Sequence, residues 1–226
     1  MSSQPATYIF DAYGTLFDVH SAVARLSARV GPDAQALSEM WRSRQLEYSW
    51  TYSLMGRAAN FWELTELSLD FAMAKHGITD PQLRSELLRS YIELEAFPEV
   101  PRVLRRLKAS GKGVVILSNG TASMVRSAAE SAGLAALVDD VLSVDAVGVF
   151  KPDRRVYQYA VDILGIEPSA ISFQSSNAWD AAGAANFGFP TIWVNRRRMP
   201  GEYKAVGQVR EVASLEALLE APEVPL

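Results

Sequence analysis

Two spacings of apolar residues occur along this chain, and they divide it into two kinds of segment. Residues 8–10 and 113–117 are short, continuous apolar runs, as expected for strands buried on both faces of a parallel sheet. From about residue 21 to 91, apolar residues instead recur every three or four positions, which is typical of amphipathic helices. The pattern predicts an α/β protein with a helical insertion after its first strand.

The inserted segment contains three long predicted helices and no predicted strand. One covers residues 35–55, and a second covers residues 60–76, which Gly77 is expected to end. A third begins after Asp80, which can cap it, with Pro81 in its first turn. The apolar stripes predicted on the first two helices are Leu37, Trp41, Tyr48 and Tyr52, and Phe61, Leu64, Leu67 and Phe71.

After Pro101 the pattern alternates between helix and strand, which predicts a doubly wound parallel sheet. We therefore expect an α/β core formed by residues 1–19 and 98–226, with an all-helical cap subdomain formed by residues 20–97. The elements expected in this part are helices at 102–110, 124–132, 154–164 and ending near 187, strands at 113–117, 141–144, 170–174 and 191–195, a weak strand near 209, and a final helix around 215–219.

Composition excludes several classes of protein. With 49% apolar residues in 226, the chain can bury a substantial core. The formal net charge of -4 and the scattered Lys and Arg residues argue against nucleic acid as a partner. The absence of cysteine excludes disulfides and thiolate chemistry, and two histidines are too few for a multi-histidine metal site within one chain.

The sequence also lacks targeting features. Its N-terminus has neither the basic nor the apolar region of a signal peptide, and no apolar run approaches membrane-spanning length. We therefore expect a cytoplasmic protein with no membrane partner.

Polar side chains stand where the predicted strands end. Asp11 follows the first strand, Ser118 and Asn119 end the second, and residues 175–180 follow the fourth, while Lys151 precedes a helix. Since the carboxyl ends of parallel strands lie at one edge of the sheet, we expect these groups to converge there. Taken singly, each carboxylate can instead cap a turn or a helix, and the lysine can be a solvated loop residue.

In this order and spacing, the motifs resemble those of the haloacid dehalogenase superfamily, and within it the L-2-haloacid dehalogenases. The similarity covers almost the whole chain, including the cap. The matching segments are residues 11–15, 118–120, 151–152 and 176–180, together with residues 41–48 of the cap.

Two positions separate this chain from the phosphatases of the same superfamily. Tyr13 and Ser176 stand where those enzymes resemble one another in carrying Asp. Magnesium prefers several oxygen ligands, carboxylates above all, so the missing carboxylates argue against a magnesium site. A phosphoryl group would also lack charge neutralisation and an acid for its leaving oxygen. The resemblance therefore implies no metal and no cofactor.

The resemblance assigns the covalent chemistry to three charged residues. Asp11 would attack carbon two of a 2-haloacid and form an ester that water later hydrolyses. Lys151 would keep this carboxylate ionised in a dry pocket, and Asp180 would activate the water. The residues expected to position these groups are Thr15, Ser175 and Asn177.

The resemblance also assigns the groups that bind substrate. Arg42, helped by Asn119, would receive the leaving halide, although without the resemblance Arg42 would be interpreted as a surface residue. Ser118 would bind the substrate carboxylate together with backbone N–H groups. Leu46 shares a helix face with Arg42 and is expected to line the pocket, and Tyr157 is expected to form hydrogen bonds there. Tyr13, Phe61 and Trp179 would form the pocket walls, and their alternative role is core packing.

Together these observations predict hydrolytic dehalogenation of short L-2-haloalkanoic acids to D-2-hydroxy acids, with the haloacid and halide as small-molecule partners. Two alternatives remain open: a magnesium-dependent phosphatase of the same fold, and a catalytically silent family member with a binding role. The aromatic-rich cap also predicts a homodimer. We expect Asp18 and His20 to serve turns at the cap junction, and residues 196–198, a run of arginines, to be a solvated loop.

Overall fold

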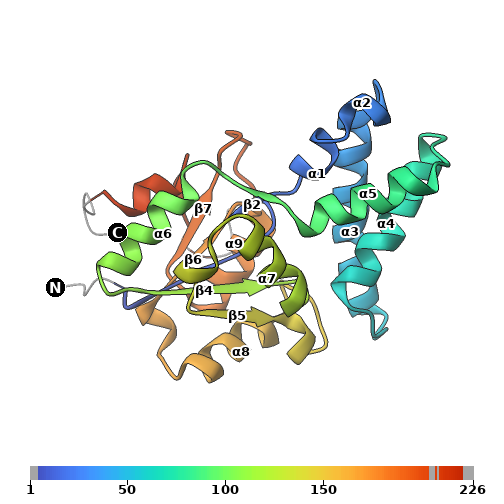
Figure 1. Cartoon of the computed structure of the whole chain (residues 1–226). Coiled ribbons are helices and arrows are strands. Elements are labelled where there is room, and N and C mark those ends of the chain that lie inside the picture. The colour runs from blue at the N-terminus through green and yellow to red at the C-terminus, as the bar shows by residue number, and fades with distance from the viewer. Residues whose placement is uncertain (1–4, 204–206, 208, 221–226) are drawn as a thin grey trace.

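A six-stranded parallel sheet forms the centre of the computed structural model, which describes residues 5–203, 207 and 209–220 (Figure 1). The strand order is β5-β4-β1-β6-β7-β8, and each neighbouring pair is parallel. The strands are β1 (Thr7–Phe10), β4 (Gly113–Ser118), β5 (Asp140–Ser143), β6 (Ile171–Ser175), β7 (Thr191–Val194) and β8 (Val209–Val212). The predicted α/β class and the predicted doubly wound sheet are both confirmed.

Helices connect these strands and cover both faces of the sheet. The chain moves from β1 to β4 to β5 in one direction and from β6 to β7 in the other. Because such crossovers are right-handed, the first two connecting helices lie on the opposite face from the last two. The pair on one face is α6 (Val100–Ala109) and α7 (Ala122–Ser131), and the pair on the other is α8 (Arg154–Leu164) and α9 (Ala178–Phe187).

Strand β1 occupies the position where the strand order reverses. It lies between β4 and β6, and its Ile9 and Phe10 are fully buried. In open α/β sheets this reversal opens a crevice beyond the carboxyl ends of the strands. Asp11, the residue after β1, stands at this crevice.

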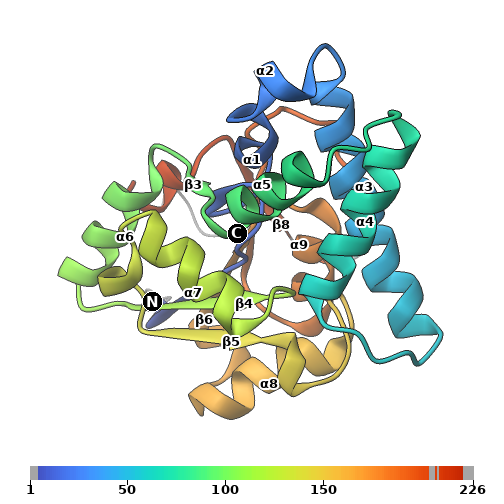
Figure 2. The same ribbon diagram turned by 45° about the vertical axis from the view of Figure 1, so that its right-hand side comes forward.

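The helical insertion lies on the side of the sheet toward which the arrows of β4 and β5 point (Figures 1 and 2). The predicted helix start at Asp80 is confirmed, with Pro81 in the first turn, and a capping box of Asn60 and Glu63 begins the preceding helix. The helices are α1 (Ser21–Ala24), α2 (Ser27–Val30), α3 (Ala34–Leu54), α4 (Phe61–Lys75) and α5 (Pro81–Ile92).

A short antiparallel ribbon, which the sequence pattern did not predict, flanks the insertion. Strand β2 (Phe17–Asp18) pairs with β3 (Glu95–Ala96), so the outgoing and returning chains run side by side. Two-residue strands are too short to produce a recognisable alternation of apolar and polar positions. Asp18 and His20 serve a turn beside this ribbon, as predicted, because the Asp18 carboxylate accepts the backbone N–H of His20 at 2.9 Å.

The predicted apolar stripe on α4 is wrong in its second half. Leu67 and Phe71 are 46% and 39% exposed, whereas Thr65 and Ser68 are fully buried. Both buried hydroxyls donate to backbone carbonyls of their own helix, so these small polar residues can face the core without losing hydrogen bonds. Hydrophobicity alone therefore misplaced the buried face of α4.

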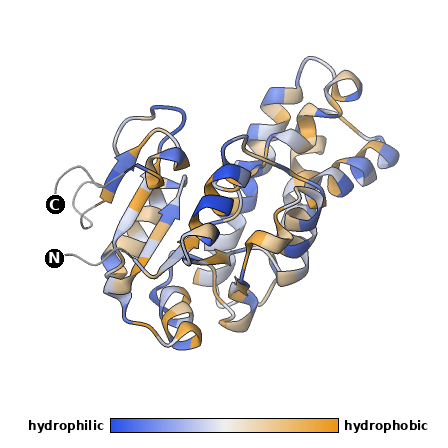
Figure 3. Cartoon of the chain, turned by 60° about the vertical axis from the view of Figure 1, so that its left-hand side comes forward, coloured by the Kyte–Doolittle hydropathy of each residue, from blue (hydrophilic) through white to orange (hydrophobic). Residues whose placement is uncertain are grey.

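Hydrophobic and hydrophilic positions alternate along most helices in Figure 3, as expected for helices with one face on a core. Among the described helices, none combines the length and apolar character needed to cross a bilayer. The predicted final helix is a single 3-10 turn, Leu215–Leu218, anchored by the buried Leu215.

Candidate active site

A buried lysine joins the two carboxylates predicted to carry the chemistry. Lys151 is fully buried, and its Nζ lies 3.2 Å from Oδ1 of Asp11 and 2.9 Å from Oδ2 of Asp180. The three residues come from the end of β1, the loop before α8, and the first turn of α9. The structure thus brings together groups that are 140 and 29 residues apart, as the strand-end argument predicted.

The two oxygens of Asp11 have different surroundings. Its Oδ2 accepts hydrogen bonds from Thr15 Oγ1 at 2.9 Å and Asn177 Nδ2 at 2.8 Å, with Ser175 Oγ at 3.5 Å. Its Oδ1 faces the ammonium of Lys151. One oxygen is therefore held by neutral donors from two loops, and the other lies beside the cation.

Asp180 is completely buried and lies within α9 rather than at its cap. Asn177 occupies the N-cap position, so the alternative that Asp180 caps the helix is wrong. Its Oδ1 accepts the hydroxyl of Tyr157 at 2.8 Å, and its Oδ2 accepts Lys151. Burial raises the pKa of Asp180 to about 6, although Lys151 opposes this shift.

Lys151 remains a cation in this setting. Burial by itself lowers the pKa of an ammonium, but the neighbouring Asp180 and Asp11 more than offset this effect, so the pKa of Lys151 is raised. The position between the two carboxylates is thus filled by a fixed positive charge. Among the described residues, no group of three or more His, Cys, Asp and Glu side chains comes together as a metal site would require.

Arg42 reaches the site from α3. Its Nη1 donates to Oε1 of Gln45 at 2.8 Å, and its Nη2 donates to the carbonyl of Tyr13 at 3.2 Å. Gln45 is itself fixed, because it donates to Thr65 at 2.7 Å and accepts the hydroxyl of Tyr91 at 3.0 Å. Helical spacing places Gln45 on the same face as Arg42, but its orienting role was not predicted, because its contacts with Thr65 and Tyr91 join separate helices.

A small pocket gathers eight of the predicted site residues. Its free volume is only about 10 Å³, which is roughly the space of one water molecule. The lining residues are Asp11, Tyr13, Arg42, Leu46, Phe61, Asn119, Asn177 and Trp179. Three of them come from the cap and five from the core, so this pocket lies where the two predicted parts meet.

The end of β4 contributes an oriented amide to this pocket. Oδ1 of Asn119 accepts the backbone N–H of Lys151 at 2.9 Å, which leaves the NH₂ of Asn119 available as a donor. Ser118 is fully buried, and its Oγ accepts the backbone N–H of Gly120 at 3.0 Å. Ser118 is not among the residues that line the pocket, so the structure does not bring it to the cavity itself.

Aromatic rings close the pocket. Tyr13 stacks on Tyr91, with ring centres 5.6 Å apart, and Trp179 packs edge-on against Trp50 at 5.3 Å. Gly120 allows the close approach of Tyr13, because a Cβ at this position would lie 2.6 Å from the ring. Tyr13 and Trp179 therefore both line the pocket and pack against other aromatic rings.

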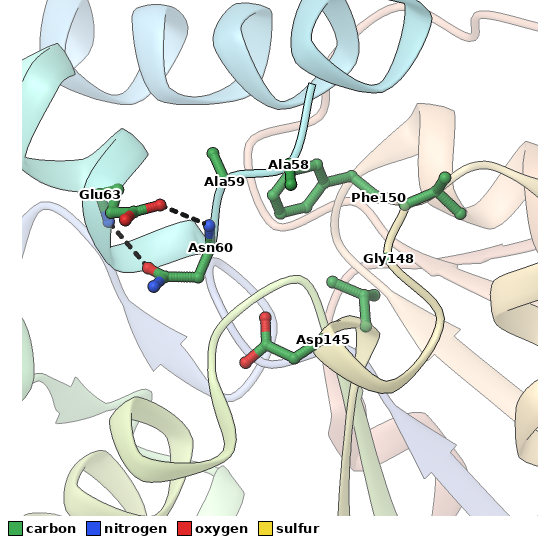
Figure 4. A pocket seen from close by; sticks show the side chains of 9 residues that line it. Ala58, Ala59, Asn60, Glu63, Asp145, Gly148 and Phe150 are labelled. Atoms are coloured by element: carbon green, nitrogen blue, oxygen red, sulfur yellow. Dashed lines mark hydrogen bonds between the residues drawn. The ribbon is translucent and has the colours of Figure 1, made fainter. Parts of the chain in front are cut away.

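A larger cavity of about 500 Å³ lies nearby between cap and core (Figure 4). It contains none of the predicted site residues, and its Asn60 and Glu63 are already paired in the capping box. The rings of Phe150, which lines this cavity, and Phe61, which lines the small pocket, lie 6.0 Å apart. We therefore place the reactive site in the small pocket, which Asp11 and Arg42 line and where Lys151 contacts Asp11.

The prediction of a solvated arginine loop is wrong for Arg196. Its side chain is 18% exposed and forms an ion pair with Glu99. It also donates to the carbonyls of Gly14 and Thr15 and to the hydroxyl of Ser176. A run of three arginines usually indicates a solvated surface, and nothing in the local sequence singles out one member for burial.

Comparisons with known proteins agree with this geometry. The haloacid dehalogenase-like hydrolase family matches residues 5–188. The chain is 46% identical over 211 residues to (S)-2-haloacid dehalogenase 4A of Burkholderia cepacia, covering 93% of this chain and 91% of that protein. It is 47% identical over 211 residues to (S)-2-haloacid dehalogenase 1 of Pseudomonas sp. (strain CBS-3), covering 93% of each.

Solved structures give the same result. The L-2-haloacid dehalogenase of Xanthobacter autotrophicus with chloropropionic acid covalently bound has a TM-score of 0.87 and 32% identity, covering 95% of this chain and 97% of that one. A dehalogenase solved with an intermediate complex has a TM-score of 0.94 and 44% identity, covering 96% and 97%. The chain therefore belongs to the (S)-2-haloacid dehalogenases, also called L-2-haloacid dehalogenases, of the haloacid dehalogenase-like hydrolase family.

Proposed function

We propose that this protein hydrolyses short L-2-haloalkanoic acids to D-2-hydroxy acids through an ester on Asp11. The observation that carries the proposal is the position of the Asp11 carboxylate, which lines a pocket with Arg42 and Asn119 and contacts the buried Lys151. The covalently bound chloropropionic acid in the Xanthobacter relative supports it.

In the first step, a lone pair of Asp11 Oδ1 forms a bond to carbon two as the carbon–halogen bond breaks. Oδ2 is approached by three donors, whereas Oδ1 has one contact among the described residues, with Lys151, so Oδ1 keeps a lone pair free for attack. The halide leaves with the bonding electrons and is stabilised by the Arg42 guanidinium and the Asn119 amide. Attack opposite the leaving group inverts carbon two, which converts the L-acid to the D-configured ester.

In the second step, water attacks the carboxyl carbon of Asp11. Asp180 takes a proton from this water as general base. Negative charge then develops on Oδ2, where Thr15, Asn177 and Ser175 already donate hydrogen bonds, as in an oxyanion hole. The bond between Oδ1 and the carboxyl carbon breaks, and the departing alkoxide takes back the proton held by Asp180 to give the hydroxy acid. The regenerated Asp11 carboxyl releases the remaining proton of the water.

Substrate entry requires the pocket to open. A free volume of about 10 Å³ is too small for a haloacid. We infer that residues 20–97 form the cap subdomain, with residues 1–19 and 98–226 as the core. The cap would then hinge at the antiparallel pair of β2 and β3, where the chain leaves the core and returns to it.

We also propose a homodimer formed through the cap. Large apolar side chains are exposed on neighbouring helices, including Leu54 at 87% and Met55 at 62% at the end of α3, and Leu67 and Phe71 on α4. Such exposed apolar residues indicate an interface between proteins. Sedimentation equilibrium would measure the mass in solution, and a monomer at micromolar concentration would contradict the proposal. A cytoplasmic location stays a prediction.

The decisive test of activity is halide release from each enantiomer of 2-chloropropionate, with and without EDTA. We expect release from the L-enantiomer, D-lactate as product, and no effect of the chelator. Asp11→Asn should release no halide. Hydrolysis of phosphate esters that EDTA abolishes would instead favour the phosphatase, and a wild-type protein that releases no halide would favour a binding role.

A further inference from the structure

Arg196, which follows β7, donates four hydrogen bonds and forms an ion pair with Glu99. Nε and Nη2 contact Oε1 of Glu99 at 2.8 and 2.7 Å. Nη1 donates to the carbonyl of Gly14 at 3.2 Å and to Ser176 Oγ at 2.7 Å, and Nη2 donates to the carbonyl of Thr15 at 2.9 Å. Each of the three guanidinium nitrogens thus donates at least one hydrogen bond, although the side chain is largely shielded from water.

These contacts hold the two segments that orient the nucleophile. Gly14 and Thr15 belong to the loop after Asp11, and Thr15 Oγ1 donates to Asp11 Oδ2. Ser176 lies between the two other residues that approach this oxygen, Ser175 and Asn177. Its backbone N–H also donates to Thr15 Oγ1 at 2.8 Å. Arg196 therefore contacts Thr15 itself and the residue between Ser175 and Asn177, without lining the pocket.

The same guanidinium also holds the chain returning from the cap. Its central carbon lies 4.0 Å above the ring centre of Phe97, and Glu99 is its ion-pair partner. Phe97 in turn donates its backbone N–H to the carbonyl of Leu16 at 3.0 Å. The Arg196 side chain thus contacts three segments: the chain that returns from the cap, the loop after Asp11 and the loop before α9.

We propose that Arg196 is a positioning residue for the reaction of Asp11, a role that rests on the proposed function. It fixes the two loops whose donors bind Oδ2 and connects them to the chain that returns from the cap. The orientation of the Asp11 carboxylate, with Oδ1 toward the substrate carbon, is thereby maintained. Misplacing a reacting group by about 1 Å can cost about a hundredfold in rate. Because Arg196 does not touch the pocket, its loss should lower the rate of ester formation far more than substrate affinity.

Three variants test this role: Arg196→Gln, Arg196→Lys and the matched control Arg197→Gln, in which the neighbouring arginine is exposed. Single-turnover mixing with L-2-chloropropionate and mass spectrometry of the protein would give the rate of ester formation against substrate concentration. Circular dichroism would establish the temperature range in which each variant is folded.

We expect Arg196→Gln to slow ester formation by about ten- to a hundredfold, with a half-saturating concentration within about threefold of wild type. Arg196→Lys should lie in between, since an ammonium keeps the charge but cannot reproduce the planar fork of donors. Arg197→Gln should match wild type.

A folded Arg196→Gln protein that forms the ester at the wild-type rate would overturn the proposal and leave Arg196 a purely structural residue. If that variant does not fold, the rate of ester formation in Arg196→Lys decides instead, and a wild-type rate in that variant would overturn the proposal. A wild-type protein that forms no ester and releases no halide would overturn the proposed function, and this inference with it.

Discussion

Nζ of Lys151 lies 3.2 Å from Oδ1 of Asp11, and both groups are shielded from solvent. The same ammonium contacts Asp180 at 2.9 Å, so one buried cation neutralises part of the charge of two buried carboxylates. Removing one member of such a cluster leaves uncompensated charge in the interior. Lys151 is therefore as important for folding as for chemistry.

We expect Lys151→Met to lower the free energy of unfolding by about 3–5 kcal/mol at pH 8 and to abolish halide release. Without the ammonium, burial raises the pKa of Asp180 with less opposition, so this carboxylate would hold a proton more tightly in the folded than in the unfolded chain. The folded variant then gains stability relative to its unfolded form as the pH falls. Urea unfolding should show a smaller loss in free energy of unfolding, relative to wild type, at pH 5 than at pH 8. An equal loss at both pH values would contradict this account.

Arg42 is predicted to act through the geometry of its guanidinium as well as its charge. Arg42→Lys keeps the charge but loses the paired contacts to Gln45 and the Tyr13 carbonyl. We expect kcat/KM to fall by about a hundredfold. The control is Arg44→Lys on the same helix, where a partly exposed arginine pairs with Glu47 outside the pocket; this variant should change activity little. Similar losses in both variants would argue against a specific role.

Asp180→Asn should separate the two chemical steps. The amide cannot accept the proton of the attacking water, so we expect ester hydrolysis to slow by about 10²–10⁴-fold. The ester on Asp11 would then accumulate and appear as a covalent adduct in the mass spectrum of the intact protein. A variant that turns over normally, or is inactive without ever accumulating adduct, would contradict the assignment of Asp180 as the base for hydrolysis.

The pH dependence of ester hydrolysis should report the ionisation of Asp180. Burial raises its pKa to about 6 in the free enzyme, and the charge of Asp11 contributes to this increase. Forming the ester removes that charge, so the base in the intermediate should have a lower pKa. The hydrolysis rate should therefore be constant at neutral pH and fall on the acid side at a pH below about 6.

Tyr157→Phe provides a directional control for this profile. The tyrosine hydroxyl donates to Oδ1 of Asp180, and this hydrogen bond lowers the pKa of the carboxyl. Removing it should move the acid side of the hydrolysis profile to higher pH. A shift to lower pH, measured by stopped flow on the preformed ester, would contradict the role given to Asp180.

Much of the fold and of the site could be predicted because the signals are local. Apolar runs marked the strands of the sheet, and the polar residues that end them identified Asp11 and Asn119. The parallel topology then brings such ends together without any long-range information. Lys151 was singled out by its place before a helix and Asp180 by its place after the fourth strand, and the family resemblance supplied their roles.

The parts that were missed depend on tertiary contacts. Arg196 has the same local sequence context as its exposed neighbours, and its burial follows from how the segments around Gly14, Phe97 and Ser176 meet. Gln45 matters because α3 and α4 pack through polar side chains. Helical spacing places Gln45 beside Arg42, but neither that spacing nor the run of arginines indicates the partners on other segments that give these two residues their roles.

The account depends most on a carbon–oxygen bond formed by Asp11 itself. The direct measurement is a single turnover of L-2-chloropropionate in H₂¹⁸O with enzyme in excess, followed by mass spectrometry of the peptide containing Asp11 and of the lactate. We predict that ¹⁸O enters the Asp11 carboxylate and that the lactate carries unlabelled oxygen at carbon two. Heavy oxygen in the lactate after this first turnover would show that water attacked the carbon directly, and it would contradict the account.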